Sequence, residues 1–507
     1  MEPEDQQGEP PAGGSSGLEA QIAERRAKRA ALREAGVDPY PARFDRTATV
    51  AELRDRHDDL AVDARSGEVV RVAGRVAGVR GHGRLVFLTL RDVTGTVQLM
   101  AQAGRLTPSA AATLERIDLG DWVGAEGEVV TSRRGELSVD VVEMTLLSKA
   151  LRPLPDKWHG LSEQETRYRH REVDLLANDD SRRVFEIRFA TVAALRRCLV
   201  AEGFVEVETP ILQPQAGGAL ARPFLTHANA LGADLALRIA PELYLKRLVV
   251  GGFERVFEIA RNFRNEGIDT RHSPEFTALE AYRAFGDYHD GMELTERLVV
   301  QAAMAATGGL TFATGEGEVD LTPPWPRETL LGLLEQHLGR PLHPTMARAE
   351  VAGVCAEHDL AVPAEWGPGK MIFELYDKLL LPSTAGPVFV TGIPVEVSPL
   401  ARHNTEDPTM ADRFELVIGG RELANGYSEL NDPDEQAERF RSEAVAAAAG
   451  DLESHPVDGA FVRALEYGLP PTSGIGLGVD RLVMLFAGVP SIRDVILFPT
   501  LRPETPA

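Results

Sequence analysis

Residues 255–282, RVFEIARNFRNEGIDTRHSPEFTALEAY, contain two runs of alternating apolar and polar residues with a charged segment between them. Successive side chains of a β-strand point to opposite faces. In the first run, the apolar face carries Phe257, Ile259 and Phe263, and the polar face carries Glu258, Asn262, Arg264 and Glu266. In the second run, Phe276, Ala278, Glu280 and Tyr282 share a face, opposite Thr277, Leu279 and Ala281. The pattern predicts two adjacent antiparallel strands with a polar floor.

Such a floor suits a nucleotide. Arg264 is a residue type that stabilises developing phosphate charge, and Phe276 offers a ring for stacking on a base. Arg271 or His272, in the segment between the strands, is placed to hold a polyphosphate tail. The alternative is an exposed charged hairpin without a ligand.

A second hairpin is predicted in DRFELVIGGRELANGYSELND, residues 412–432, where Gly419 and Gly420 form a two-residue turn between apolar strands. The predicted register pairs Val417 with Glu422 and Glu415 with Ala424, so that Glu415 and Glu422 lie diagonally on one face. Two such carboxylates favour a cation between them, and Mg²⁺ bridging substrate phosphates fits this chemistry. The alternative is two solvated surface glutamates.

A third segment, GIGLGVDRLVMLFAG at residues 474–488, alternates glycine with apolar residues before an apolar helix. Gly474, Gly476 and Gly478 leave one strand face without side chains, so a ligand can approach the backbone. Arg481, at the start of the helix, is placed to meet a phosphate. The spacing matches neither GxGxxG nor GxxxxGKS, which excludes those two nucleotide-binding loops.

The N-terminal third has a different pattern. Five short alternating runs between residues 68 and 149 predict a small barrel of the OB type, with a barrel that does not bind nucleic acid as the alternative. The predicted divisions are a disordered tail (1–17), a helical segment (18–66), the barrel (67–150), a linker (151–178) and a large α/β domain (179–507). In that domain, Asp180 and Ser181 are predicted to cap a helix that ends at Gly203. Its buried stripe is Phe185, Phe189, Val192, Leu195 and Leu199, and the strand VEVETPIL, interrupted by Pro210, follows it.

Charge and cysteine content limit the function classes. The net charge of −23 argues against a general nucleic-acid binder, but residues 1–150 carry only −4 of it, so any polyanion contact is expected in this part rather than in the rest of the chain. Cys198 and Cys355 form no CxxC pair, which gives no support for a disulfide framework or zinc site and favours a reducing cytoplasm. No signal peptide or membrane span is predicted.

Taken in order, these segments resemble the three signature motifs of class II aminoacyl-tRNA synthetases: motif 1 at about 181–212, motif 2 at about 255–282 and motif 3 at about 474–488. From about residue 20 to the last turn, the chain is similar to bacterial lysyl-tRNA synthetases, as in LGDWVGAEG, KALRPLPDKWHGL, GGALARPF, GYSELNDP and RDVILFP. The resemblance implies an α+β fold, with an N-terminal OB-fold barrel and a class II antiparallel-sheet catalytic domain with flanking helices. It also implies ATP and Mg²⁺ dependence, adenylation of L-lysine, its transfer to the 3′ end of tRNA(Lys), and a cytoplasmic homodimer built partly on motif 1.

The same resemblance assigns the site residues. For ATP it implies Arg264 on the α-phosphate, Glu266 and His272 around the nucleotide, Phe276 on adenine and Arg481 on the γ-phosphate, with Glu415 and Glu422 on Mg²⁺. Arg264 and Arg481 are the implied catalytic residues. The implied lysine pocket consists of Gly218, Glu242, Glu280, Tyr282, Asn425, Tyr427, Glu429 and Gly476. The physical reading agrees, because an ammonium tip with three donors requires convergent carboxylates.

For the anticodon, the resemblance implies stacking on Phe87 and reading by Gln98; the alternative is a buried Phe87 and an incidental Gln98. The chain departs from the family at Glu172, in RYRHREVDL, where an aromatic residue is usual. Two other functions remain open. An aspartyl- or asparaginyl-type synthetase would need a cationic pocket, and a duplicated lysyl-type paralogue cannot be separated by sequence.

Overall fold

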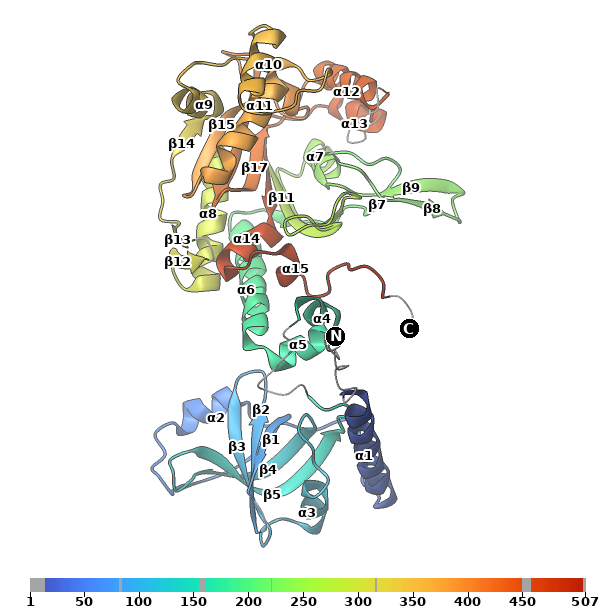
Figure 1. The fold of residues 1–507 in the computed structure, drawn as a ribbon, viewed down its shortest axis with the longest axis vertical. Coiled ribbons are helices and arrows are strands. Elements are labelled where there is room, and N and C mark those ends of the chain that lie inside the picture. Colours follow the sequence, from blue (N-terminus) through green and yellow to red (C-terminus); the bar gives the residue numbers. More distant parts are fainter. Residues whose placement is uncertain are drawn as a thin grey trace, which may run out of the picture. The chain divides into compact units, whose positions relative to one another are not determined.

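The computed structural model describes residues 14–81, 84–154, 161, 163–219, 221–314, 317–448 and 457–504. The chain divides into two compact units, Met1–Gly160 and Leu161–Ala507 (Figure 1). The predicted disorder of residues 1–13 and part of the predicted linker, 155–160 and 162, lie outside the described residues.

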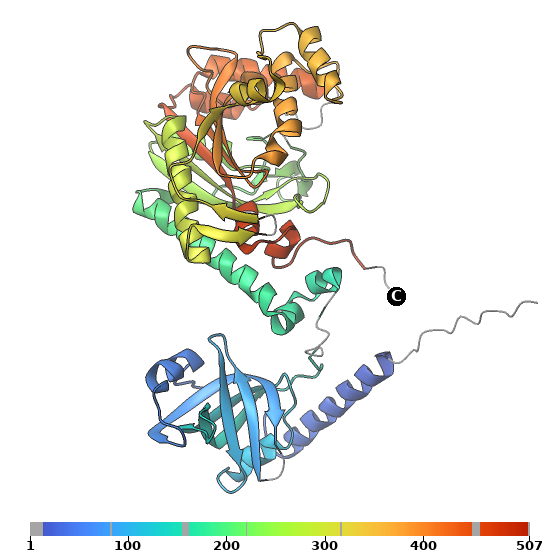
Figure 2. The same ribbon diagram turned by 60° about the vertical axis from the view of Figure 1, so that its left-hand side comes forward.

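The first unit contains a closed five-stranded barrel, which confirms the predicted OB-type fold (Figure 2). Its strand order is β1-β2-β3-β5-β4. The strands are β1 (Arg65–Arg80), β2 (Leu85–Arg91), β3 (Thr96–Gln102), β4 (Trp122–Thr131) and β5 (Leu137–Ser148), and the helices are α1 (Gly14–Glu34), α2 (Val50–His57) and α3 (Pro108–Leu114). Alternate apolar residues fill the interior, and Leu32 of α1 and Leu53 of α2 pack against the same core. Residues 14–17, predicted to be disordered, form the first turn of α1.

The second unit is built on an eight-stranded sheet of order β14-β15-β16-β17-β18-β11-β10-β6. Its six central strands are antiparallel, and β14 and β6 join the two edges in parallel. The strands are β6 (Val205–Glu206), β10 (Arg255–Phe263), β11 (Glu275–Ala284), β14 (Arg327–Thr329), β15 (Val388–Pro394), β16 (Met410–Ile418), β17 (Arg421–Ser428) and β18 (Thr472–Gly478). The expectation of an antiparallel catalytic sheet is therefore correct for the central strands.

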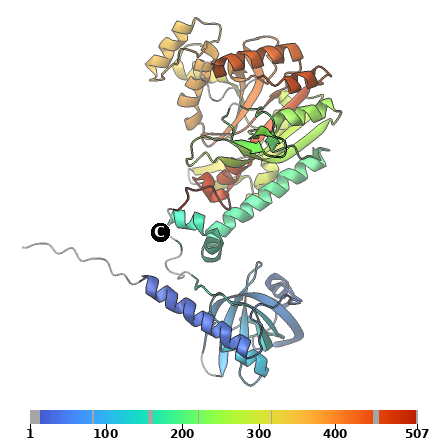
Figure 3. The same ribbon diagram turned by 90° about the vertical axis from the view of Figure 1, so that its right-hand side faces the viewer.

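Helices cover the apolar face of this sheet, with α6 (Asp179–Ala201) as one long helix (Figure 3), together with α8 (Tyr288–Thr307) and α14 (Val479–Ala487). Further helices are α4 (Gln164–Arg169), α5 (Arg171–Ala177), α7 (Glu242–Val250), α12 (Pro433–Ala448), α13 (Gly459–Leu465) and α15 (Ile492–Val495). Another group, α9 (Leu330–Leu338), α10 (Arg348–Glu357) and α11 (Pro368–Leu379), has its own apolar core against β15. Two small sheets complete the unit, β7-β9-β8 (Leu212–Gln213, Ala233–Leu237, Leu225–Ala228) and β12-β13 (Thr311–Thr314, Gly317–Asp320). The other face of the central strands is left for polar side chains.

Three local expectations differ from the structure. The stretch 163–178, predicted as linker, forms α4 and α5, because the buried Arg171 bonds to the carbonyls of Arg493 and Leu497. The run VEVETPIL forms only the two-residue strands β6 and β7 around Pro210. Helix α6 begins after Asn178, and its Phe189 is 58% exposed rather than buried, because the core contacts fall on the other side of the helix.

In the parts of the chain that the structure describes, no helix combines the length and apolar character needed to cross a bilayer. The cysteines Cys198 and Cys355 are both unpaired.

Candidate active site

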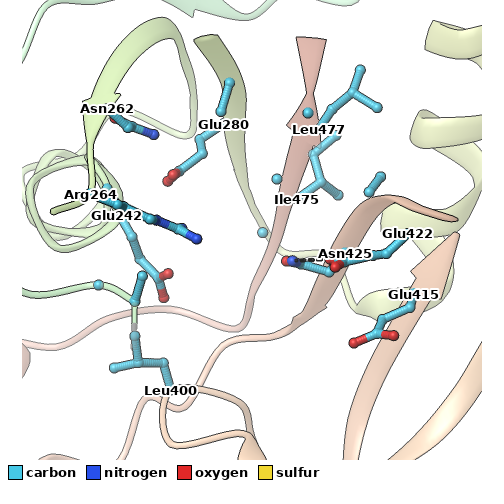
Figure 4. A pocket seen from close by; sticks show the side chains of 18 of the residues that line it. Glu242, Asn262, Arg264, Glu280, Leu400, Glu415, Glu422, Asn425, Ile475 and Leu477 are labelled. Atoms are coloured by element: carbon cyan, nitrogen blue, oxygen red, sulfur yellow. Dashed lines mark hydrogen bonds between the residues drawn. The ribbon is translucent and has the colours of Figure 1, made fainter. Parts of the chain in front are cut away.

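A cavity of about 540 Å³ lies over the polar face of β10, β11, β17 and β18. Figure 4 shows its side chains converging from these strands and from α7, with Glu242, Arg264 and Glu280 near one another and Glu415 and Glu422 across from them. All residues that the sequence assigns to lysine, ATP and Mg²⁺ line this cavity. The segments 255–282, 412–432 and 474–488 therefore meet at one place, whereas no residue of 181–212 lines the cavity.

The β10–β11 pair has the predicted alternation, with Glu258 opposite Glu280 and Asn262 opposite Phe276. Glu258, Asn262 and Glu280 are buried, which rules out an exposed charged hairpin. Arg264 lies just past the end of β10, and its guanidinium stacks 5.0 Å from the centre of the Phe276 ring. Its Nε is buried without a hydrogen-bond partner among the described residues. The Arg264 side chain is thus held in place by stacking while a buried donor stays free.

The segment after Arg264 supplies charges at the open side of the cavity. Glu266 accepts a bond from the backbone N–H of Arg222 at 3.3 Å. His272 pairs with Asp269 at 2.9 Å, and this contact holds the pKa of Asp269 at about 2. His272 and Arg271 are exposed and line the cavity. The loop therefore brings cations to the cavity mouth without burying them.

The β16–β17 hairpin turns at Gly419 and Gly420, which have φ values of 59° and 67°, as a two-residue turn of this type requires. Val417 pairs with Glu422 as predicted, but Glu415 pairs with Asn425 and not with Ala424. A register shift between Leu416 and Val417 causes the difference, because a bulge adds one residue to one strand. Both glutamates nevertheless line the cavity.

Glu415 is buried, and its carboxylate accepts a 2.7 Å bond from Arg413. Burial raises the pKa of Glu415 to about 7, and Glu422 adds to the effect while Arg413 opposes it. Burial acts in the same direction on Glu422, but Arg481, the Asn425 hydrogen bond, Arg413 and Arg264 together leave the pKa of Glu422 below its usual value. Arg481 also donates a 2.9 Å bond to the Glu422 carbonyl. The pair is therefore not two solvated surface glutamates, since one carboxylate is buried and the other is tied to Arg481.

At another side of the cavity three buried carboxylates converge, those of Glu242, Glu280 and Glu429. Tyr427 donates to Glu242 at 2.6 Å, and Tyr282 donates to Glu280 at 3.0 Å. Burial, together with the charge of Glu242, raises the pKa of Glu280 to about 8. Three acidic groups packed this closely require cations to balance them.

One such cation was missed by sequence reasoning. Lys246, on α7 one turn after Glu242, is fully buried and pairs with Glu242 at 2.6 Å and with Glu429. Burial would lower the pKa of Lys246, but the two glutamates raise it above its usual value. The available signal was the i, i+4 spacing from Glu242 on an otherwise apolar helix face.

Two glycines make room for these carboxylates. A Cβ on Gly474 would overlap the Glu429 carboxylate and press on the Tyr282 ring. Gly218 has a φ of +89°, and a Cβ there would lie 3.1 Å from the Glu242 Cβ. Gly476 faces Asn425, whose amide donates to Glu422 at 3.0 Å. At Gly474, the absence of a side chain on this strand face is thus required by the Glu429 carboxylate and the Tyr282 ring.

The barrel unit places Phe87 and Gln98 on one face. Thr89 pairs with Gln98 across β2 and β3, and Phe87 lies two residues before Thr89 on the same strand. Phe87 is half-buried. Gln98 donates to Ser138 at 3.0 Å and accepts from Arg80 at 3.2 Å. The two residues are therefore diagonal neighbours. Glu172, by contrast, is 65% exposed on α5.

The chain matches the family described as tRNA synthetases class II (D, K and N) over residues 163–502, and an OB-fold nucleic acid binding domain over residues 70–147. It therefore belongs to the class II tRNA synthetases of the D, K and N family. Its relatives include a lysine--tRNA ligase of Syntrophomonas wolfei, 45% identical over 94% of this chain and 96% of that protein. A heat-inducible lysine--tRNA ligase of Escherichia coli K12 is 48% identical, covering 96% of each chain. A lysine--tRNA ligase of Bordetella bronchiseptica is 49% identical, covering 95% of this chain and 97% of that one.

Proposed function

We propose that this chain activates L-lysine with ATP and transfers it to tRNA(Lys), as the names of its relatives describe. The observation that carries the proposal is the convergence of Glu242, Glu280 and Glu429 in one buried pocket. A substrate with two ammonium groups neutralises these carboxylates, whereas the acidic side chain of aspartate would meet like charges. The pocket chemistry thus favours lysine over the aspartyl-type alternative.

The direct test is ATP/pyrophosphate exchange with each of the twenty amino acids, followed by charging of tRNA transcripts. We expect exchange with lysine and charging of a lysine-accepting transcript. Exchange with aspartate or asparagine in place of lysine would overturn the proposal.

The chemistry of adenylation follows from position and charge. The lysine carboxylate attacks the α-phosphorus of ATP, and pyrophosphate leaves. In our proposal Arg264 stabilises the charge that develops on the α-phosphate, while Arg481 holds the γ-phosphate. Phe276 stacks on adenine, and Glu266 and His272 contact the nucleotide. The tRNA 3′-terminal ribose hydroxyl then attacks the adenylate and releases AMP.

Glu415 and Glu422 fit a divalent cation. Their hard oxygen donors suit Mg²⁺, and the raised pKa of Glu415 reflects a carboxylate that needs a further positive charge. Within the described ranges no group of three or more His, Cys, Asp or Glu could hold a metal. We propose that phosphate oxygens of ATP and water would supply the remaining ligands. When bound, Mg²⁺ would supply charge neutralisation on the phosphates.

Lysine binding is expected to release a proton. With a pKa of about 8, Glu280 is mainly protonated in the empty pocket at about pH 7, but it must be ionised to bind an ammonium group. Lysine binding lowers the pKa of Glu280, so lysine affinity should increase as pH rises from about 6.5 to about 8.5. In this range the ε-ammonium of lysine stays protonated, because its pKa is about 10.4. Calorimetry at about pH 7 in buffers of different ionisation enthalpy measures the release. Proton uptake, or release that persists in Glu280→Gln, would contradict this assignment.

We place the anticodon on the barrel face that carries Phe87 and Gln98. Phe87→Ala and Gln98→Ala are both expected to reduce tRNA charging. Phe87→Ala removes a ring on which a base stacks, a loss of about 1–3 kcal/mol, and Gln98→Ala removes the amide that reads a base. Lysine-dependent exchange should be unchanged, since it needs no tRNA. Val142→Ala, an exposed apolar position on β5, is the matched control. Equal loss of exchange and charging would show a folding defect instead.

A homodimer completes the proposal. Large apolar side chains are exposed on α6, β6, β7 and their connection: Phe189, Val200, Val205, Ile211 and Leu212. Exposed large apolar side chains on these segments favour a subunit interface. Light scattering on the wild type and on Phe189→Glu would test the dimer. We expect the enzyme to work in the cytoplasm, where tRNA is charged.

A further inference from the structure

Lys246 lies behind the pocket wall. Its side chain is fully buried and is not part of the cavity lining. Its ammonium contacts Glu242 and Glu429, and it lies 5.5 Å from the centre of the Tyr427 ring and 5.9 Å from that of Phe461. Two carboxylates that line the cavity are thus paired with a cation that does not line it.

Lys246 supplies a positive charge that balances the carboxylates of the pocket. The pocket presents three buried carboxylates, and a bound lysine substrate brings two ammonium groups. The carboxylate of that substrate is directed to the α-phosphorus and does not add to the charge of the pocket. Lys246 is the third positive charge. One Glu429 oxygen, Oε1, is buried and has no hydrogen-bond partner among the described residues, so it remains available to the substrate.

We propose that Lys246 is a positioning residue for lysine, whose ammonium pairs with the Glu242 and Glu429 carboxylates and orients both before the substrate arrives. This inference rests on the proposed function. Without Lys246, the empty pocket would hold three carboxylates with no internal cation against Glu242 and Glu429. Such groups take up protons instead of remaining charged.

The surrounding groups make the effect visible in a pH profile. The acidic and phenolic groups facing the cluster are Glu242 of α7, Glu280 and Tyr282 of β11, Tyr427 of β17, Glu429 after it, and Glu258 of β10. The cations near it besides Lys246 are Arg238, which pairs with Glu258, Arg264 near Glu280 and Arg413 near Tyr427. Burial raises the pKa of Glu429 while Lys246 opposes the rise. Loss of Lys246 should therefore raise the pKa of Glu429 further.

The test is Lys246→Met, a substitution of similar length without charge, assayed by lysine-dependent exchange. We expect KM for lysine to rise by about 30-fold or more, with KM for ATP unchanged. The acid limb of kcat/KM for lysine should move to higher pH by about 1–3 units, because lysine binds the ionised cluster. If Lys246 had a purely structural role, its loss would leave the pH profile in place and would not change the KM for lysine alone.

Arg247→Met is the matched control, since Arg247 is the next residue of α7, is exposed and stacks on Tyr244. It should behave as wild type. The double variant Lys246→Met/Glu429→Gln removes both charges of the pair, which buried sites tolerate better than loss of one. We compare the effect of Lys246→Met in two backgrounds. Lysine affinity should fall far less when Lys246→Met is added to Glu429→Gln than when it is introduced into the wild type.

Two results would overturn the inference: a folded Lys246→Met with the lysine KM and pH profile of the wild type, or equal losses in the two backgrounds. If Lys246→Met does not fold, the double variant compared with Glu429→Gln decides. Failure of the proposed function is separate, because wild-type exchange would then not depend on lysine.

Discussion

Arg264→Ala is expected to lower the rate of lysine-dependent ATP/pyrophosphate exchange by about 10²–10³, the loss seen when one preorganised donor is removed. Arg264 stacks on Phe276 and keeps a buried Nε without a partner among the described residues, so its guanidinium is already in place before charge develops. The loss should therefore fall on kcat more than on KM for lysine.

Arg261→Ala is the matched control for this change. Arg261 lies on the same strand β10, is exposed, and is not part of the cavity lining. We expect it to keep wild-type exchange. Wild-type exchange in a folded Arg264→Ala would reject the role of Arg264, and an equal loss in both variants would point to damage to β10.

Glu280→Gln is expected to weaken lysine binding by about 2–5 kcal/mol, because it removes one partner of a buried charge pair. This corresponds to a rise in Kd of about 30- to 5,000-fold. ATP binding should be nearly unchanged, since the phosphate contacts proposed here come from Arg264 and Arg481. Calorimetric titration with lysine, and separately with ATP, measures both effects. The titration is best done at about pH 9, where Glu280 of the wild type is ionised.

Glu275→Gln provides the control, because Glu275 is on the same strand β11 but outside the cavity lining, paired with Arg261 at 3.6 Å. It should bind lysine as the wild type does. Glu429→Gln is expected to weaken lysine binding as well. If lysine binds Glu280→Gln and Glu429→Gln as tightly as wild type, the lysine assignment loses its physical basis.

Lys246 is a residue outside the cavity lining that contributes to the charge of the pocket. Glu242 and Glu429 come from α7 and from the segment after β17, and each would be costly to bury alone. The fold balances them with a lysine that is fully buried one helical turn from Glu242. The charge of the pocket is therefore set partly by a residue that the substrate is not expected to touch.

Local sequence patterns predicted most of the strands of the site and the faces on which their side chains lie. Alternation in residues 255–282 correctly put Glu280 and Tyr282 on the side of the cavity, and the Gly419–Gly420 turn was correct. The five barrel strands were also predicted, because period-two patterns and turn residues are local signals.

The tertiary structure alone decided what depends on contacts between distant segments. The extra residue Leu423 of β17, opposite Leu416 and Val417, changed the partner of Glu415, because register depends on how both strands pack in the sheet. Phe189 turned outward, since which side of α6 meets the core is fixed by the elements packed against it. The pairing of Lys246 with Glu429 joins residues far apart in the chain, and only folding brings those two charges together in a medium where water cannot screen them.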